Sequence, residues 1–118
     1  FLTQPVYSKE DIDRLTYIKE QSGAKLICGI MPLVSYKNAR FVANEMPGIF
    51  VPEEIVNRYR EDMNREEAEA VAIDISLELA EGLKEVADGY YFMTPFNRAS
   101  LIAGIIDQIK DKIDIKYE

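Results

Sequence analysis

The sequence predicts an α/β fold in which short parallel strands alternate with helices, and three observations support this prediction. The apolar run at residues 25–31 is continuous rather than alternating, as in strands that are buried on both faces of a parallel sheet. Residues 90–93 are rich in β-forming aromatic side chains. Between these runs, apolar residues recur at helical spacing. Because the 118 residues suit one compact domain, we treat residues 1–118 as a single unit.

The chain is predicted to open with the end of a strand at residues 1–5, followed by a helix. Ser8, with Asp11 three residues later, is an N-cap signature, and Gly23 is a suitable residue for the end of the helix. The apolar face of this helix is predicted to consist of Ile12, Leu15 and Ile18. The strand at residues 25–31 follows.

A second helix is predicted to begin after Ser35 and to end at the Pro-Gly pair of residues 47–48. Its inward residues are predicted to be Ala39, Val42 and Ala43. Residues 49–51 are a candidate for a very short strand. Pro52 closes this strand and suits the first position of another helix at residues 53–59.

A long helix is predicted after Asn64, which forms an N-cap signature with Glu67. Its apolar stripe is predicted to consist of Val71, Ile75, Leu79, Leu83 and Val86, flanked by Ala68 and Ala72. Gly89 ends the turn that follows, and the strand at residues 90–93 comes next. A last helix is predicted from about Arg98, with Leu101, Ile102, Ile105, Ile106 and Ile109 facing inward.

This order of elements predicts part of a barrel rather than a whole open sheet. A sheet of three complete strands (residues 25–31, 49–51 and 90–93) would leave two unpaired edges and an uncovered face. An open doubly wound fold would have about five strands. The first residue is Phe1 rather than Met, within a strand-like phrase, and we expect the chain to be cut from a longer one.

The composition excludes several classes of function. Asp and Glu number 21 against 14 Lys and Arg, so the net charge is −7, and the basic stripe of a nucleic-acid-binding protein is missing. The same balance disfavours a membrane surface as partner, and no uncharged run is long enough to span a bilayer. No signal peptide is recognisable. A lone cysteine, Cys28, indicates a reducing compartment, and we expect a cytoplasmic protein with Cys28 as a core residue.

The chain has no histidine, which removes histidine-based acid–base catalysis and the usual zinc sites, and we expect no metal. Ligands of parallel α/β proteins lie at the carboxyl ends of the strands. The phrases at those ends, residues 3–5, 31–36 and 94–98, combine aromatic and amide side chains and contain no Asp or Glu. This combination indicates a pocket for a flat heterocycle rather than a metal cage or a phosphate-binding loop.

Each candidate residue in these phrases also has a purely structural interpretation. Gln4 can tie down a loop, Tyr36 can pack at the start of a helix, and Asn97 can cap the last helix. Arg98 opposes the helix dipole at a helix N-terminus, which favours an anionic ligand.

The phrases at residues 1–7, 29–36 and 96–98 resemble the C-terminal half of the methylenetetrahydrofolate reductase family, in order, from residue 1 to about residue 109. The first two phrases are most similar to the version that is fused behind a homocysteine S-methyltransferase domain. The resemblance implies a (β/α)8 TIM barrel that carries FAD, of which this chain would span roughly the end of strand 5 through helix 8. It also implies an oxidoreductase that reduces 5,10-methylenetetrahydrofolate to 5-methyltetrahydrofolate. NADH, NADPH or another donor would supply the electrons.

The resemblance also implies roles for five residues. Gln4 matches the family's pterin-contacting glutamine, since an amide can donate and accept together. Tyr36 matches an aromatic residue that stacks on the folate or the nicotinamide. Arg98 would pair with the carboxylates of the folate tail, and Thr94 and Phe96 would line the same mouth.

The family's acidic catalytic residue and most of its FAD contacts match no position of this chain. We therefore expect no catalytic residue here, unknown cofactor-binding residues, and a fragment that is inactive alone. Its expected partners are the folate, the remaining N-terminal half of the barrel and, for the isolated piece, other copies of itself. A non-catalytic ligand-binding or regulatory module and an unrelated soluble α/β domain are the alternatives.

Overall fold

The computed structural model describes residues 2–93 and 99–112 of the chain. In chain order the elements are β1 (Leu2–Pro5), α1 (Lys9–Ser22), β2 (Ile27–Ile30), α2 (Tyr36–Glu45), α3 (Glu53–Val56), α4 (Arg65–Leu83), β3 (Gly89–Phe92) and α5 (Ala99–Lys112). The α/β class and the alternation of strands with helices are confirmed.

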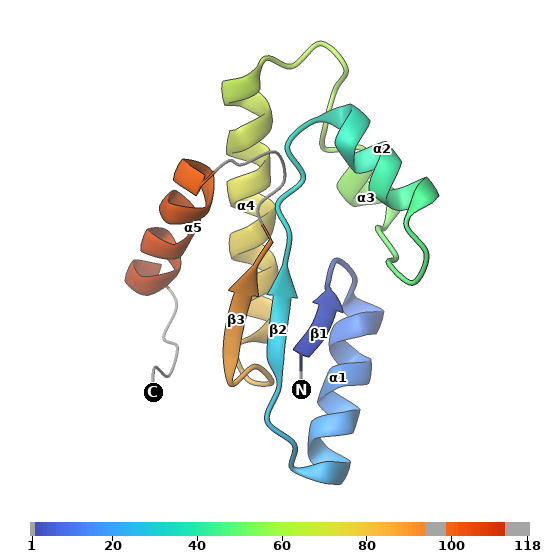
Figure 1. Ribbon diagram of the computed structural model, residues 1–118, viewed down its shortest axis with the longest axis vertical. Helices are drawn as coiled ribbons and strands as arrows, with labels where there is room; N and C mark the ends of the chain where they lie inside the picture. Colours follow the sequence, from blue (N-terminus) through green and yellow to red (C-terminus); the bar gives the residue numbers. More distant parts are fainter. Residues whose placement is uncertain (1, 94–98, 113–118) are drawn as a thin grey trace.

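The strands form one parallel sheet in the order β1-β2-β3. In Figure 1 the three arrows point the same way, α4 lies behind them, and none of the drawn helices crosses their near face. Ile27 pairs with Gly89 and Gly29 pairs with Tyr91, while β1 joins β2 with a shift of register between Leu2 and Pro5. The described part of the chain is therefore a sheet with helices on one face and an open opposite face.

The core lies between the sheet and the helices. Successive side chains of a strand point to opposite faces, and in β2 Cys28 and Ile30 point towards α4. One cluster joins β2 to α4 and α5 and contains Ile30, Val34, Ala80, Leu101, Ile105 and Ile109. A second joins the segment after β1 and the start of β2 to the end of α4, and contains Val6, Leu26, Cys28, Leu83 and Val86. A third joins the loops to α2, α3 and α4 and contains Tyr7, Leu33, Ala39, Val42, Val51, Val56, Tyr59, Ile75 and Leu79.

The predicted caps of α1 and α4 are present, while Asn97, the predicted cap of the last helix, lies outside the described residues. The Ser8 hydroxyl accepts from the backbone N–H of Asp11 at 3.1 Å, and α1 ends at Gly23 in the left-handed conformation, with φ 66°. At the start of α4, the Asn64 side chain accepts from the Glu67 N–H at 2.8 Å, and the Glu67 carboxylate accepts from the Asn64 N–H at 3.1 Å. These contacts explain where α1 and α4 begin.

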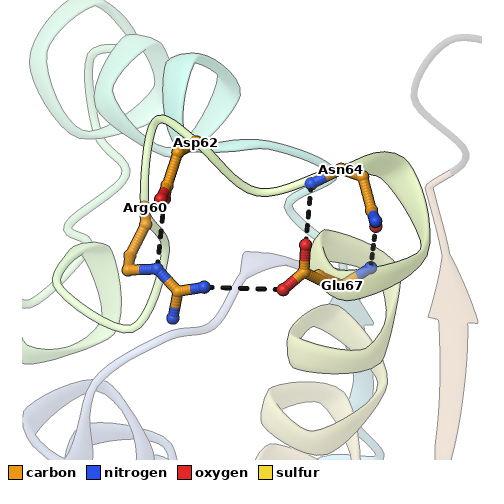
Figure 2. Close-up of polar contacts among 4 residues, drawn as sticks. All are labelled: Arg60, Asp62, Asn64 and Glu67. Carbon is orange, nitrogen blue, oxygen red and sulfur yellow. Dashed lines mark hydrogen bonds and ion pairs between the residues drawn. The ribbon is translucent and has the colours of Figure 1, made fainter.

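The loop before α4 is tied to this capping box by an arginine (Figure 2). Arg60 donates to Asp62 at 3.1 Å and to Glu67 at 3.5 Å, so Glu67 joins the loop and the cap. A second arginine, Arg58, forms a two-pronged ion pair with Glu78 of α4, with nitrogen–oxygen distances of 3.0 and 2.8 Å. The segment between α3 and α4 is thus held against α4 at its first turn, through Glu67, and again further along the helix, through Glu78.

Residues 49–51 do not form the predicted strand. Val51 is buried in the cluster with α2 and α3, whereas Phe50 is 58% exposed. β2 already pairs with β1 on one side and with β3 on the other, so this segment cannot pair with β2. Within the described residues the sheet accordingly has no strand between β2 and β3, and residues 49–51 serve as a packed connection between helices.

The prediction for α1 was wrong at one position. Ile12 and Leu15 pack on the second of the three clusters, but Ile18 is 40% exposed. α1 lies beside the edge strand β1 (Figure 1), where the small sheet covers only part of the apolar face of the helix. None of the helices in the described part is both long and apolar enough to cross a membrane.

Candidate functional site

The candidate site lies at the carboxyl ends of the parallel strands, where ligands of parallel α/β proteins bind. β1 ends at Pro5 and β2 at Ile30, on the side of the sheet from which the chain continues to α2 (Figure 1). Gln4 lies in the last part of β1, and Tyr36 begins α2 after the loop that follows β2. Thr94, Phe96 and Arg98 lie outside the described residues.

Two buried tyrosines hold the loop that follows β2. The Tyr7 hydroxyl donates to the carbonyl oxygen of Met31 at 2.6 Å, and the Tyr59 hydroxyl donates to that of Leu33 at 2.7 Å. Burial raises the pKa of both phenols above the ordinary value, so both stay protonated donors. The backbone after β2 is therefore anchored from the β1–α1 loop and from the loop after α3.

The same loop continues into the cap of α2. The Ser35 hydroxyl accepts from the Asn38 N–H, and the Asn38 side chain accepts from the Val34 N–H, each at 3.0 Å. These reciprocal bonds fix the first turn of α2, which begins with Tyr36. The position of Tyr36 thus follows from a rigid loop and a capped helix.

Tyr36 has structural contacts of its own. The side chain is half-buried against the cluster of α2, α3 and α4, and the Arg40 guanidinium lies 5.9 Å from the ring centroid. Arg40 also donates to Glu53 at 3.2 Å, which links α2 to α3. The packing interpretation of Tyr36 is therefore correct for part of the ring, and Arg40 is a neighbour that the sequence analysis missed.

Gln4 is exposed at the end of β1, and its carboxamide lies beside the backbone of Gly48. A β-carbon on Gly48 would lie 3.1 Å from Oε1 and 3.5 Å from Nε2 of Gln4. Among the described residues, no group hydrogen-bonds this carboxamide, so a loop-tying role is not what the structure displays. The carboxamide offers one hydrogen-bond acceptor and one donor group that no described residue uses.

The backbone under Gln4 is held by Thr3. The Thr3 hydroxyl accepts from the Gly29 N–H at 3.0 Å and donates to the Gln4 carbonyl at 2.9 Å. From β3, the Tyr91 hydroxyl reaches across Gly29 and donates to the carbonyl of Thr3. A β-carbon on Gly29 would lie 2.8 Å from that hydroxyl oxygen, so this crossing requires glycine in β2.

The remaining candidates for reactive groups have structural roles. Cys28 is fully buried, and burial raises the pKa of its thiol to about 11, which confirms the core interpretation. In the part of the chain that the structure describes, no three acidic, cysteine or histidine side chains gather as metal ligands would.

A small parallel sheet with helices packed on it places the chain in the α/β class, in which ligands bind at the carboxyl ends of the strands. The family model of methylenetetrahydrofolate reductase matches residues 1–110, and the chain belongs to this family. The resemblance carried by the strand-end phrases is thereby confirmed. None of the curated proteins compared with the chain matches it significantly.

Proposed function

We propose that the whole protein is a flavin-dependent oxidoreductase that reduces 5,10-methylenetetrahydrofolate to 5-methyltetrahydrofolate, and that this chain supplies the folate-binding half of its site. Membership of the methylenetetrahydrofolate reductase family supports the reaction. The observation that carries the assignment of this half is the exposed Gln4 carboxamide, at the carboxyl end of a parallel strand and without a partner among the described residues.

Gln4 is proposed to bind the edge of the pterin ring. That edge presents adjacent donors and acceptors, and a carboxamide matches such a pair because it donates through nitrogen and accepts through oxygen. The hydrogen bonds of Thr3 to Gly29 and to the Gln4 carbonyl keep the backbone at this position in place. The amide is thus offered to the ligand from a rigid strand.

Tyr36 is proposed to stack on the folate, or on nicotinamide in the other half-reaction. Its loop is anchored by the hydroxyls of Tyr7 and Tyr59, so little conformational freedom is lost when a flat ligand binds. Arg98 is proposed to pair with the carboxylates of the folate tail, with Thr94 and Phe96 beside it. These three assignments rest on the family alone.

FAD, when bound, supplies hydride transfer in the proposed reaction. Tyr91 occupies the space over Gly29 on the open face of the sheet, so a flavin ring would not lie against that point of β2. We therefore assign no flavin contact to the described residues and propose that these contacts come from the rest of a (β/α)8 barrel. NADH, NADPH or another electron donor and the fusion to a homocysteine S-methyltransferase domain are proposed on the resemblance, and a cytoplasmic location on the lone cysteine Cys28.

The open face of the sheet is proposed to meet the other half of the barrel. Leu2 is 72% exposed on the edge strand β1, which has no partner strand on its outer side within the described residues. Such an edge and face favour pairing with further strands. The isolated chain should therefore self-associate, and light scattering over a dilution series tests this. A compact monomer at every concentration would contradict it.

The test of the function uses the intact flavoprotein. Its flavin is reduced without oxygen and mixed with 5,10-methylenetetrahydrofolate, and reoxidation is followed together with formation of 5-methyltetrahydrofolate. Gln4→Ala should raise the folate KM by about tenfold or more, the effect of losing one or two good hydrogen bonds. Gln21→Ala is the matched control, because Gln21 is an exposed glutamine in the last turn of α1.

Two results would overturn the proposal. If the folate does not reoxidise the reduced flavin, 5,10-methylenetetrahydrofolate is not the substrate. Equal folate KM values for Gln4→Ala and Gln21→Ala would show that Gln4 does not bind the folate, and would contradict the proposal that this chain supplies the folate-binding half of the site. A protein without flavin would instead favour a non-catalytic ligand-binding module.

A further inference from the structure

The turn after α2 carries a glycine that meets the candidate folate residue. α2 ends at Glu45, and Gly48 follows with φ 82°, a backbone conformation that L side chains rarely adopt. This turn brings the backbone of Gly48 against the carboxamide of Gln4, which lies 44 positions earlier in the chain. The turn after α2 thus lies beside the end of strand β1.

We propose that Gly48 is a positioning residue for Gln4: its backbone limits the rotation of the carboxamide, and its missing side chain leaves the space that the carboxamide occupies. The inference deepens the proposed function, on which it rests. According to this inference, the turn after α2 contributes to the affinity for folate.

The geometry shows why a contact at this point matters. The terminal torsion of a glutamine is broad, so the carboxamide needs an outside contact to prefer one orientation. Thr3 holds only the backbone of Gln4, whereas Gly48 lies against its amide. A β-carbon at Gly48 would be 3.1 Å from Oε1 and 3.7 Å from Cδ, so the flexible amide would have to move by a few tenths of an ångström. Displacement of the Gln4 amide should therefore change the affinity for folate rather than the stability of the fold.

A glycine at positive φ can be required for its backbone conformation alone, whatever space its missing side chain leaves. A second glycine at positive φ separates these two roles. Gly23 has φ 66°, but no atom lies within 4 Å of the position its β-carbon would take. Gly23→Ala therefore imposes a similar backbone strain without any contact with Gln4. It is the matched control for Gly48→Ala.

The experiment compares the intact wild-type flavoprotein with Gly48→Ala and Gly23→Ala. It measures the thermal midpoint, the calorimetric Kd for 5-methyltetrahydrofolate, and the KM for 5,10-methylenetetrahydrofolate. Both variants should lower the midpoint. Only Gly48→Ala should raise the folate Kd and KM, by roughly three- to tenfold for a displaced contact, while the rate of flavin reduction by the electron donor stays unchanged. In a Gln4→Ala background, Gly48→Ala should weaken folate binding no further.

If Gly48→Ala does not fold, Gly48→Asn provides the same test. Asparagine tolerates positive φ and carries the same β-carbon, so it should reproduce the loss of folate affinity with less strain. Equal folate Kd values for the Gly48 and Gly23 variants would overturn the inference, as would an undiminished effect of Gly48→Ala without Gln4. If the wild type binds no folate, the proposed function fails and the inference with it. If the wild type binds folate and Gly48→Ala binds it equally well, the inference about Gly48 is wrong but the proposed function stands.

Discussion

The hydroxyl of Tyr59 donates to the carbonyl oxygen of Leu33 at 2.7 Å, in a buried contact between residues 26 positions apart. Leu33 lies in the middle of the loop that leads from β2 to Tyr36. The bond therefore connects the segment after α3 with the loop that places a candidate ligand-stacking residue. Tyr7 makes the equivalent contact two residues earlier, with Met31.

Removal of the Tyr59 hydroxyl should destabilise the protein. Tyr59→Phe leaves the buried Leu33 carbonyl without its donor, which should lower the free energy of unfolding by about 1–3 kcal/mol. Urea denaturation followed by circular dichroism measures the change. Tyr17→Phe is the control, since Tyr17 is 64% exposed and should be neutral. A stability of Tyr59→Phe equal to that of the control would mean that water replaces the hydroxyl.

A side chain at Gly29 should destabilise the sheet. The β-carbon of Gly29→Ala would lie 2.8 Å from the Tyr91 hydroxyl and 3.2 Å from the Thr3 carbonyl, and the latter belongs to a paired strand that cannot yield easily. We expect a loss of about 1–3 kcal/mol, as for other overpacked sites. Gly104→Ala in α5 meets nothing within 4 Å and should be neutral or stabilising by up to about 1 kcal/mol.

The same unfolding measurement tests the role of Tyr91. Addition of Tyr91→Phe removes the atom nearest to the new β-carbon and should recover part of the loss in Gly29→Ala. If the two losses simply add, the clash does not involve the Tyr91 hydroxyl.

Asp88 should contribute stability that depends on pH. Its carboxylate accepts from Lys19 at 2.5 Å and from the Leu26 N–H at 2.8 Å, and these bonds, that of Lys19 first, lower its pKa below the ordinary 3.8. The contribution is therefore fully present above pH 3.8 and is lost as the pH falls through the lower folded-state pKa. Since the pair of Asp88 and Lys19 is partly exposed and screened by solvent, we expect it to contribute about 1 kcal/mol or less to the free energy of unfolding.

Denaturation of Asp88→Asn at pH 7 and at about pH 3 measures this contribution. The variant should be less stable than the wild type at pH 7, and the difference should shrink at the lower pH. Glu85→Gln, which alters an exposed carboxylate in the turn after α4, serves as control. A difference between Asp88→Asn and the wild type that stays constant with pH would assign the effect to packing.

Cys28 should resist thiol reagents in the folded protein. Burial raises its pKa to about 11, so at pH 8 the thiolate is scarce as well as inaccessible. Ellman's reagent should label it slowly in buffer and at once in denaturing urea. The measurement is unambiguous because the chain has one cysteine. Rapid labelling of the native protein would show that the strand β2 opens readily.

Local signals predicted much of the fold. The side chains of Ser8, Ser35 and Asn64 cap the helices that the sequence analysis placed after them, because a cap and its N–H partner lie three residues apart. The prediction of a strand at residues 49–51 was wrong: β2 is paired on both sides by β1 and β3, and the sequence does not show which strands become neighbours. For the site, Gln4 and Tyr36 could be named from their strand-end phrases, whereas the contact of Gln4 with Gly48 could not.

The sequence by itself determined the class of fold, the starts of α1, α2 and α4, and the family, since these depend on periodicity, on capping patterns over a few residues and on motifs at strand ends. It did not determine every helix end, because the helix predicted at residues 53–59 stops at Val56. Only the tertiary structure decided how the strand-end motifs are held. The Tyr59 hydroxyl reaches Leu33, Tyr91 crosses Gly29 to Thr3, and Gly48 borders the amide of Gln4. Each of these contacts joins residues at least 26 positions apart, and no local pattern specifies which backbone carbonyl or side chain the folded chain will bring within reach.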